Sequence, residues 1–499
     1  MSSFNDKNYY QAPYSDSQYP SYYLSRTAQA PVNKQPRLTR RRIVIGICLI
    51  WASFLVLLPT TTDKAAELYS DISNSISLPS FTQAQKHQCL DAIELQRDLL
   101  ISSYKQSFYN VTHVALVDYP DHNNAGDAAI LLGELLLLES LGIEIRYVCT
   151  LFNYNATELD ASLADIPREN TAIALHGGGN FGNIWVDPQH FRMRLINSTL
   201  DRRIRSFPQT YEFFEPTETR PNQLLADTQA IYARYPDLEL VGRDHQSFEQ
   251  ITDNFPDNVV KLTPDAAVMI GSLPDSAASP RQMRFSSSSP FSNNFGWPSL
   301  ELNTHEPAQD VVVIARNDRE GGQDHRGVNW TSSLYPFDVQ MADWADHFGD
   351  ITFGEKRTYS EDHSGDFLHY WVDKARFRVE QAMDLMLSAH FVVTDRLHAH
   401  VMSTLLGVGH VVIEETKLRK VGKVHDSWYS ACAVPLGTLV KTREEVKERE
   451  SDANSVFVTN IEDATTAAMS LLTIGWEEED VSYARVVPQE VGEFEGIEK

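Results

Sequence analysis

The sequence is poor in cysteine and in basic residues, and both shortages exclude classes of protein. Its 499 residues include four cysteines, and their spacing indicates neither a dense disulfide framework nor a zinc site. Lysine and arginine together number 43 against 68 acidic residues, which gives a formal net charge of −25. This balance argues against nucleic acid as a partner, although an anionic small molecule can still bind where the charge is locally positive.

Several nucleotide- and metal-binding signatures are also missing. The glycine run at 177–179 is not followed by Gly-Lys-Ser/Thr, so it is no Walker motif, and it is no G-x-G-x-x-G in the dinucleotide-binding sense. No Asp-x-Asp flanked by apolar residues is present, which argues against a metal-dependent sugar transferase. We therefore expect no metal and no cofactor.

The N-terminal region predicts a membrane anchor. Residues 1–42 are rich in Tyr, Ser, Gln and Pro, lack apolar periodicity and read as a disordered tail. An uncharged apolar run from Ile43 to Leu58 follows four arginines and would form a helix about 24 Å long. That length suits a thin early-secretory membrane, and the arginines place the N-terminus in the cytosol. No small-residue cleavage site follows Leu58, so a signal anchor is favoured over a cleaved signal peptide.

This topology predicts that residues 60–499 are lumenal, with a Ser- and Thr-rich stem at 59–85. Four sequons then lie in the lumen, at Asn110, Asn155, Asn197 and Asn329. Three cysteines, Cys89, Cys149 and Cys432, lie outside the anchor and allow one disulfide and one free thiol. The sequence does not say which two pair.

The lumenal part alternates apolar strands with helices, which is typical of parallel α/β sheets. Expected strands include His113–Val117, Thr171–Leu175 and Val259–Leu262, within an N-terminal α/β domain at 86–271. A Ser- and Pro-rich linker or insert at 272–309 precedes a second α/β domain at 310–475 and an acidic tail at 476–499. We predict an α/β protein with two Rossmann-like domains that face a cleft.

Two glycine-containing motifs follow expected strands of the first domain. Asn124-Ala-Gly126-Asp127 marks a strand-to-helix turn, where Gly126 permits close backbone approach and Asp127 can cap the helix. An ordinary capped loop would explain this motif equally well. The run Gly177-Gly178-Gly179-Asn180 directly follows an apolar strand, so a ligand or another chain segment could lie against its backbone amides. A flexible loop is the alternative.

Two further motifs place cations where strands end. Arg243 follows an apolar strand and can bind a carboxylate or phosphate through two parallel hydrogen bonds, or else pair with Asp244 at the surface. Arg396, Leu397 and His398 follow a second buried strand and open a helix. Positive charge is unfavourable at a helix N-terminus, so this placement suggests an anionic ligand or a histidine kept neutral until needed.

In order and spacing these motifs resemble the polysaccharide pyruvyl transferase family over about residues 110–430. The matching pieces are Asn124-x-Gly126-Asp127, Gly177–Asn180, Gly242-Arg243-Asp244 and Arg396-Leu397-His398-Ala399, with a weaker match at Arg316. The resemblance implies a two-domain glycosyltransferase-B-like fold, phosphoenolpyruvate as donor and a sugar diol as acceptor. The anchor and stem resemble those of fungal members that cap galactose on secreted glycans, which implies a single-pass type II protein of the Golgi membrane.

The resemblance also suggests roles for individual residues. Arg243 and Arg396, with Leu397 and Arg316, are candidates for binding the donor, and His398 is the candidate acid–base because its ordinary pKa lies near working pH. The motifs at 124–127 and 177–180 are loop and acceptor candidates. His400 lies two positions further along the helix, about 200° away, and is expected to point away from the cleft. The alternatives are a metal-independent nucleotide-sugar glycosyltransferase and a non-enzymatic lumenal lectin or scaffold.

Overall fold

The computed structural model describes most of the expected lumenal part of the chain. The described residues are 83–199, 202–214, 223–270, 307–316, 328–335, 337–344, 366–414, 419–434, 455–458 and 461–472. The expected anchor at 43–58, most of the linker at 272–309 and the acidic tail lie outside them. Among the described helices, none combines the length and the apolar character that crossing a membrane requires.

The first sheet is entirely parallel, in the strand order β2-β1-β3-β5-β7-β6-β4 with β8 beside β7. Its strands are β1 His113–Val117, β2 Glu144–Cys149, β3 Thr171–Leu175, β4 Gly178–Gly182, β5 Ile204–Ser206, β6 Gln209–Glu212, β7 Glu239–Gly242 and β8 Val259–Leu262. Its helices are α4 Ala125–Ser140, α5 Ala156–Ser162, α6 Val186–Ser198, α7 Leu224–Tyr232 and α8 His245–Asn254. Helices that connect parallel strands cover both faces of such a sheet.

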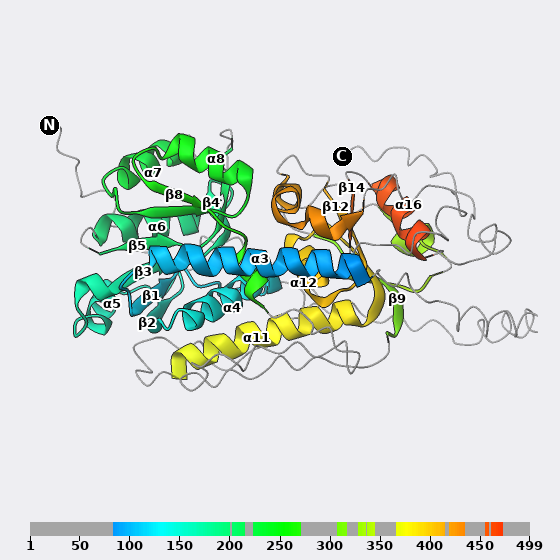
Figure 1. Cartoon of the computed structure of the whole chain (residues 1–499), viewed down its shortest axis with the longest axis horizontal. Coiled ribbons are helices and arrows are strands. Elements are labelled where there is room, and N and C mark those ends of the chain that lie inside the picture. Colours follow the sequence, from blue (N-terminus) through cyan, green and yellow to red (C-terminus); the bar gives the residue numbers. More distant parts are fainter. Residues whose placement is uncertain are drawn as a thin grey trace, which may run out of the picture. The chain divides into compact units, whose positions relative to one another are not determined.

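The second sheet is also parallel, in the order β10-β9-β11-β12-β14-β13. Its strands are β9 Gln309–Ile314, β10 Val339–Ala342, β11 Ala389–Thr394, β12 His410–Ile413, β13 Ala433–Val434 and β14 Ser455–Val458. Its helices are α9 Trp330–Ser333, α11 Asp366–Leu387, α12 Leu397–Leu406, α13 Lys420–Val424 and α16 Ile461–Leu472. The two parallel sheets confirm the predicted α/β class (Figure 1).

The two sheets share one apolar core, because α4 packs between elements of both. Helix α4 is apolar around most of its circumference, which is typical of a helix buried on all sides. One continuous cluster of buried side chains joins Leu131 of α4 to Met383 of α11 and Val401 of α12. Burial of such residues contributes roughly 25 cal/mol per Å² of apolar surface, so this shared core holds the two sheets together.

One expected loop differs in the structure. The glycine run was predicted as a loop after β3, but Gly178–Gly182 forms strand β4, which pairs with β6 at the edge of the first sheet. Glycine is depleted in strands, so its presence in one often marks a place where another backbone or a ligand approaches closely.

Helix α3, Gln83–Ser107, runs beside elements of both sheets (Figure 1). Near its C-terminus the hydroxyl of Tyr104 donates to the carbonyl of Ser206 at 2.7 Å. Nearer its N-terminus Gln96 donates to the carbonyl of Trp428 at 3.0 Å, and Cys89 forms a disulfide with Cys432. The structure thus settles the pairing that the sequence left open, and Cys149 is a buried free thiol.

We expect the Cys89–Cys432 disulfide to contribute to stability because it joins cysteines 343 positions apart in the sequence. Replacing both cysteines with alanine should cost roughly 2–5 kcal/mol, since the cross-link restricts the unfolded chain. The measurement is the melting temperature with and without reductant. Reductant should lower it in the wild-type protein and leave the double variant unchanged; equal melting temperatures of the two oxidised proteins would contradict this contribution.

Candidate active site

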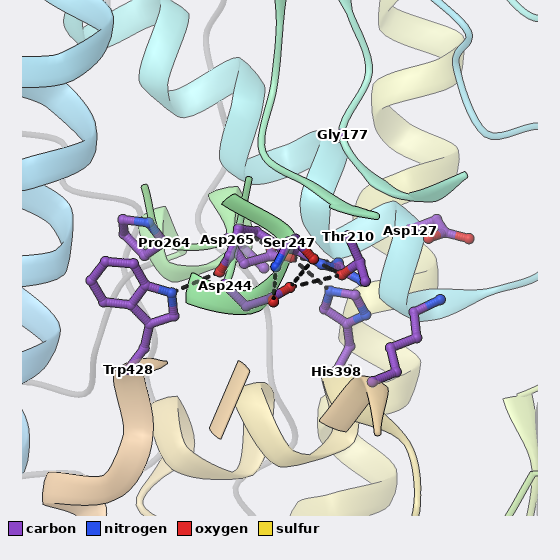
Figure 2. A network of polar contacts seen from close by, with 12 residues as sticks. Asp127, Gly177, Thr210, Asp244, Ser247, Pro264, Asp265, His398 and Trp428 are labelled. Atoms are coloured by element: carbon purple, nitrogen blue, oxygen red, sulfur yellow. Dashed lines mark hydrogen bonds and ion pairs between the residues drawn. The ribbon is translucent and has the colours of Figure 1, made fainter. Parts of the chain in front are cut away.

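The carboxyl ends of strands from both sheets meet in one polar site. In parallel α/β sheets ligands bind outside these ends, so chemistry-bearing residues that directly follow strands are the candidates. Figure 2 shows His398 extending from the second-sheet elements toward Asp265 of the first-sheet elements. The residues that meet here, or lie beside this contact, are Asp127, Arg243, Asp265, His398 and Lys420.

His398 lies at the centre of this site, in the first turn of α12, and its side chain is largely buried. Its Nε2 atom lies 3.5 Å from Oδ2 of Asp265. On the other side of the ring, Nδ1 lies so close to Gly126 that a Cβ atom there would come within 2.5 Å of it. Gly126 is therefore required to be glycine because the imidazole of His398 occupies the space of a side chain.

Asp265 links His398 to Arg243. The same Oδ2 atom accepts a hydrogen bond of 2.8 Å from a terminal nitrogen of Arg243, while Oδ1 accepts from the backbone N–H of Ala267 at 2.9 Å. Burial alone would raise the pKa of Asp265, but the neighbouring His398 and Arg243 hold it well below its usual value. Asp265 is therefore an anion at neutral pH.

Arg243 is completely buried, and its head group is largely used by protein partners. Its Nε donates to the hydroxyl of Thr210 at 2.6 Å and one terminal nitrogen donates to Asp265. The other terminal nitrogen, Nη2, is buried and makes no hydrogen bond. Arg243 thus orients Asp265, and its Nη2 is left to meet a ligand.

The backbone around Arg243 is also where the second half of the chain docks. The indole N–H of Trp428 donates to the carbonyl of Arg243 at 2.7 Å, and the backbone N–H of His245 donates to Ser427 at 3.0 Å. Asp244 caps α8 by accepting from the backbone N–H of Ser247 at 2.7 Å (Figure 2). Asp244 is thus a helix cap rather than the surface partner of Arg243 that the sequence allowed.

Asp127 extends from the first turn of α4 next to His398. Asn124 caps this helix, accepting from the Gly126 N–H at 2.9 Å and donating to Asp127 at 2.8 Å. His122 lies 3.4 Å from the same carboxylate. Burial would raise the pKa of Asp127, but the surrounding histidines and Lys420 outweigh it and lower the pKa. The first glycine motif therefore both caps a helix, as the sequence allowed, and places a carboxylate in the site.

The glycine run lies against α4 through a buried acid–histidine pair. Glu134 accepts from the Gly177 N–H at 2.8 Å, and its second oxygen lies 2.8 Å from Nδ1 of His176. Burial would lower the pKa of His176, but the charge of Glu134 outweighs it and raises the pKa. Burial also raises the pKa of Glu134 itself. Neither Glu134 nor His176 was among the predicted site residues.

The end of the glycine run meets the second half of the chain. The ammonium of Lys420 lies over Gly179, where a Cβ atom would come within 2.0 Å of Nζ. Lys420 also pairs with Glu212, at the end of β6, over 3.1 Å. Asn180 is the next residue of β4 and is half-buried. The sequence predicted that a ligand or another chain segment lies against these glycines. In the structure, Lys420 of the same chain lies there.

The other predicted donor residues make contacts within the second half. Arg396 precedes α12 and its Nε donates to Asp343 at 2.6 Å, with its guanidinium 5.8 Å from the ring of Trp344. Leu397 is buried in the shared core. The backbone N–H of Arg316 donates to Asp395 at 2.8 Å. Arg396 is therefore an ion-paired residue, like Arg243, rather than an open cation.

His400 points to a different part of the protein from His398. It is completely buried in a chain of three histidines, 2.8 Å from His410 and 3.1 Å from His425. His410 Nδ1 lies 2.8 Å from the carbonyl of Val408, which can only accept, so that nitrogen carries the proton. Burial lowers the pKa of His400 well below its usual value and that of His425 to about 4. His400 and His425 are therefore neutral at physiological pH.

Asp265, Glu134 and Lys420 were missed by sequence reasoning. Asp265 could have been found, because it follows β8 after Thr263 and Pro264 as Arg243 follows β7. Glu134 lies two turns along α4 from Asp127, on the same face. No sequence signal pointed to Lys420. Across the described stretches, no group of three or more His, Cys, Asp or Glu side chains is arranged to hold a metal ion.

The chain is similar to several known proteins. Pyruvyl transferase 1 of Schizosaccharomyces pombe is 33% identical over 364 residues, 71% of this chain and 80% of that protein. General stress protein 30 of Bacillus subtilis is 26% identical over 58% of this chain and 71% of its own length. A functionally uncharacterised protein from Klebsiella pneumoniae, of known crystal structure, aligns over 67% of this chain and 93% of its own, with a TM-score of 0.36 and 17% identity.

The family assignment rests on a segment that contains most of the site. Residues 124–416 match the family model of polysaccharide pyruvyl transferases, a range that begins at the cap of α4 and includes Asp127, Arg243, Asp265 and His398. Since this match covers more than half of the chain and the fission yeast relative supports it, the chain belongs to the polysaccharide pyruvyl transferase family.

Proposed function

We propose that this pyruvyl transferase takes pyruvate from phosphoenolpyruvate and joins it to two hydroxyls of one sugar, releasing phosphate. The observation that carries the proposal is the position of His398, which lies against the start of α4 and beside the anionic Asp265. A histidine next to a buried carboxylate is well placed to hold and transfer a proton. We further propose that the two sheets correspond to two domains of a glycosyltransferase-B-like enzyme.

The reaction needs one proton donor and two proton acceptors. His398 can donate the first proton and accept the next one. Its imidazolium protonates the methylene carbon of phosphoenolpyruvate, and the neighbouring carbon becomes electron-poor. A sugar hydroxyl adds to that carbon and its proton restores His398. Phosphate then leaves and a second hydroxyl closes the ketal, its proton departing with the phosphate. Asp265 stabilises the imidazolium and holds the ring in place. The proposed reaction needs neither metal nor cofactor.

The proposed acceptor is a terminal galactose of a glycan, and the proposed location is the lumenal side of the Golgi membrane. The first part rests on the resemblance to fungal family members, and the second on the apolar run at 43–58. The asparagines of all four sequons, Asn110, Asn155, Asn197 and Asn329, are exposed, as oligosaccharide attachment would require.

The donor can be tested with purified protein. Phosphoenolpyruvate and a β-galactoside should release inorganic phosphate and yield an acid-labile adduct that is heavier by the pyruvate ketal. Phosphoenolpyruvate alone should raise the melting temperature, because a ligand that binds only the folded state stabilises it. Stabilisation by a nucleotide sugar, with none by phosphoenolpyruvate at equal concentration, would instead favour a metal-independent glycosyltransferase. Binding of galactosides without any turnover would favour a lectin.

His398→Asn should lower the turnover number by about 10²–10⁴, the usual contribution of a general acid–base. The variant should still be stabilised by phosphoenolpyruvate, since loss of an interaction used only in the transition state spares ground-state binding. A suitable control is His113→Asn. His113 lies at the amino end of β1, whereas the site lies at the carboxyl ends of the strands. His400→Ala is a poor control because that side chain is completely buried. Full turnover by His398→Asn would place the proton donor elsewhere.

The proposed topology predicts glycosylation of the full chain. Peptide N-glycosidase should increase its electrophoretic mobility, and replacing Asn110, Asn155, Asn197 and Asn329 by Gln should abolish that shift. In sealed microsomes, added protease should remove only the tail before Ile43 and leave the catalytic part intact. Digestion of the catalytic part without detergent, or no mobility shift at all, would contradict a lumenal enzyme.

A further inference from the structure

Lys420 reaches from the second half of the chain onto the glycine run of the first. It opens α13, which follows β12, and His398 opens α12, which follows the neighbouring strand β11. Both residues therefore lie beyond the carboxyl ends of adjacent parallel strands. A Cβ atom on Gly178 would lie 3.6 Å from Oδ1 of Asp127, and one on the next residue, Gly179, would meet Lys420, so the lysine and this carboxylate approach neighbouring residues of the glycine run. The charge of Lys420 contributes to lowering the pKa of Asp127.

The close contact with Gly179 shows that this position is closely fitted. A Cβ atom on Gly179 would lie 2.0 Å from Nζ and 2.7 Å from Cε of Lys420, well inside contact distance. Any other residue at this position would push the ammonium away. Because these atoms are the far end of a flexible side chain, the lysine could yield to a larger residue, but its charge would then lie elsewhere.

The proposed donor needs a cation of this kind. Phosphoenolpyruvate carries a phosphate and a carboxylate, and the two arginines expected to bind them already face buried carboxylates. Arg243 is paired with Asp265 and Arg396 with Asp343, so much of their charge is balanced within the protein. Lys420 is paired with Glu212 and its side chain remains 15% exposed, so a ligand can reach it. A lysine ammonium is a compact point charge that suits phosphate.

We propose that Lys420 is a donor-binding residue whose ammonium, held over Gly179, binds the phosphate group of phosphoenolpyruvate. Glu212 pairs with the lysine when no donor is bound, and the doubly charged phosphate competes with that carboxylate. This inference rests on the proposed donor. It differs from a purely structural role, in which Lys420 and Glu212 only tie the two halves together.

Two substitutions on the same ion pair separate these roles. Lys420→Ala should raise KM for phosphoenolpyruvate about ten- to hundredfold, the loss expected for one charge-assisted hydrogen bond, with KM for the galactoside unchanged. Glu212→Gln should lower KM for phosphoenolpyruvate, because it removes the competing carboxylate. If the Lys420–Glu212 pair had only a structural role, both substitutions would change KM for phosphoenolpyruvate in the same direction. Equal or parallel shifts would overturn the proposal.

Gly179→Ala gives an independent test from the other half of the chain. It should raise KM for phosphoenolpyruvate in the wild-type background, because the added methyl displaces the ammonium. In the Lys420→Ala background it should have no further effect on KM, since the displaced group is gone. The matched control is Lys261→Ala, which breaks a part-buried Lys261–Glu239 pair of 2.9 Å near the start of β7. That control should leave KM for phosphoenolpyruvate unchanged.

Binding of simple anions distinguishes this inference from the proposed function. Inorganic phosphate should raise the melting temperature of the wild-type protein, and Lys420→Ala should lose most of that rise; stabilisation by pyruvate should be the same in both. Loss of the pyruvate effect instead would mean that the lysine binds the carboxylate and would overturn the phosphate assignment. Should the wild-type protein fail to turn over phosphoenolpyruvate, the proposed function fails, and equal phosphate binding by both proteins would still overturn the role of Lys420.

Discussion

The carboxylate of Asp265 is completely buried, and a buried anion is tolerated only where neighbouring charges and hydrogen bonds compensate it. Arg243 compensates it from the end of β7, the start of the following turn supplies a backbone N–H, and His398 faces it from α12. This one requirement explains why an arginine is buried without access to solvent. On the other side of the His398 ring, Nδ1 lies where a side chain at position 126 would be, so that position needs a glycine.

The regular elements could be predicted where burial leaves a simple pattern. Strands β1 and β3 have the expected bounds, because short runs of Val, Leu, Ile and Ala in parallel sheets are apolar on both faces. Strand β8 also has the expected bounds, although its residues are only partly buried. Strands β4 and β6 were missed. Gln209, Thr210 and Glu212 are polar yet buried, because their partners come from elements distant in the sequence, such as Arg243 for Thr210 and Lys420 for Glu212. The local periodicity of the sequence does not reveal such partners.

The residues of the site could likewise be predicted only in part from the sequence. The motifs around Gly126, Gly179, Arg243 and His398 could be found because each comes after a predicted strand, before the next element begins. Their contacts could not, since spacing along the chain does not say that Gly126 accommodates His398 or that Gly179 accommodates Lys420. Arg243 was predicted to bind the donor, and the structure adds that it also donates hydrogen bonds to Thr210 and Asp265. The role of such a residue depends on neighbours that only the fold brings together.

The disulfide between Cys89 and Cys432 has a consequence for the integrity of the molecule. Every residue of the site, from Asp127 to Lys420, lies between these two cysteines in the sequence. Cutting one peptide bond anywhere in that interval therefore yields two fragments that remain covalently joined. Each fragment stays at a high effective concentration around the other, so reassociation is intramolecular. In an oxidising compartment the enzyme would thus behave as one molecule even after a single proteolytic nick, and only reduction would release its two pieces.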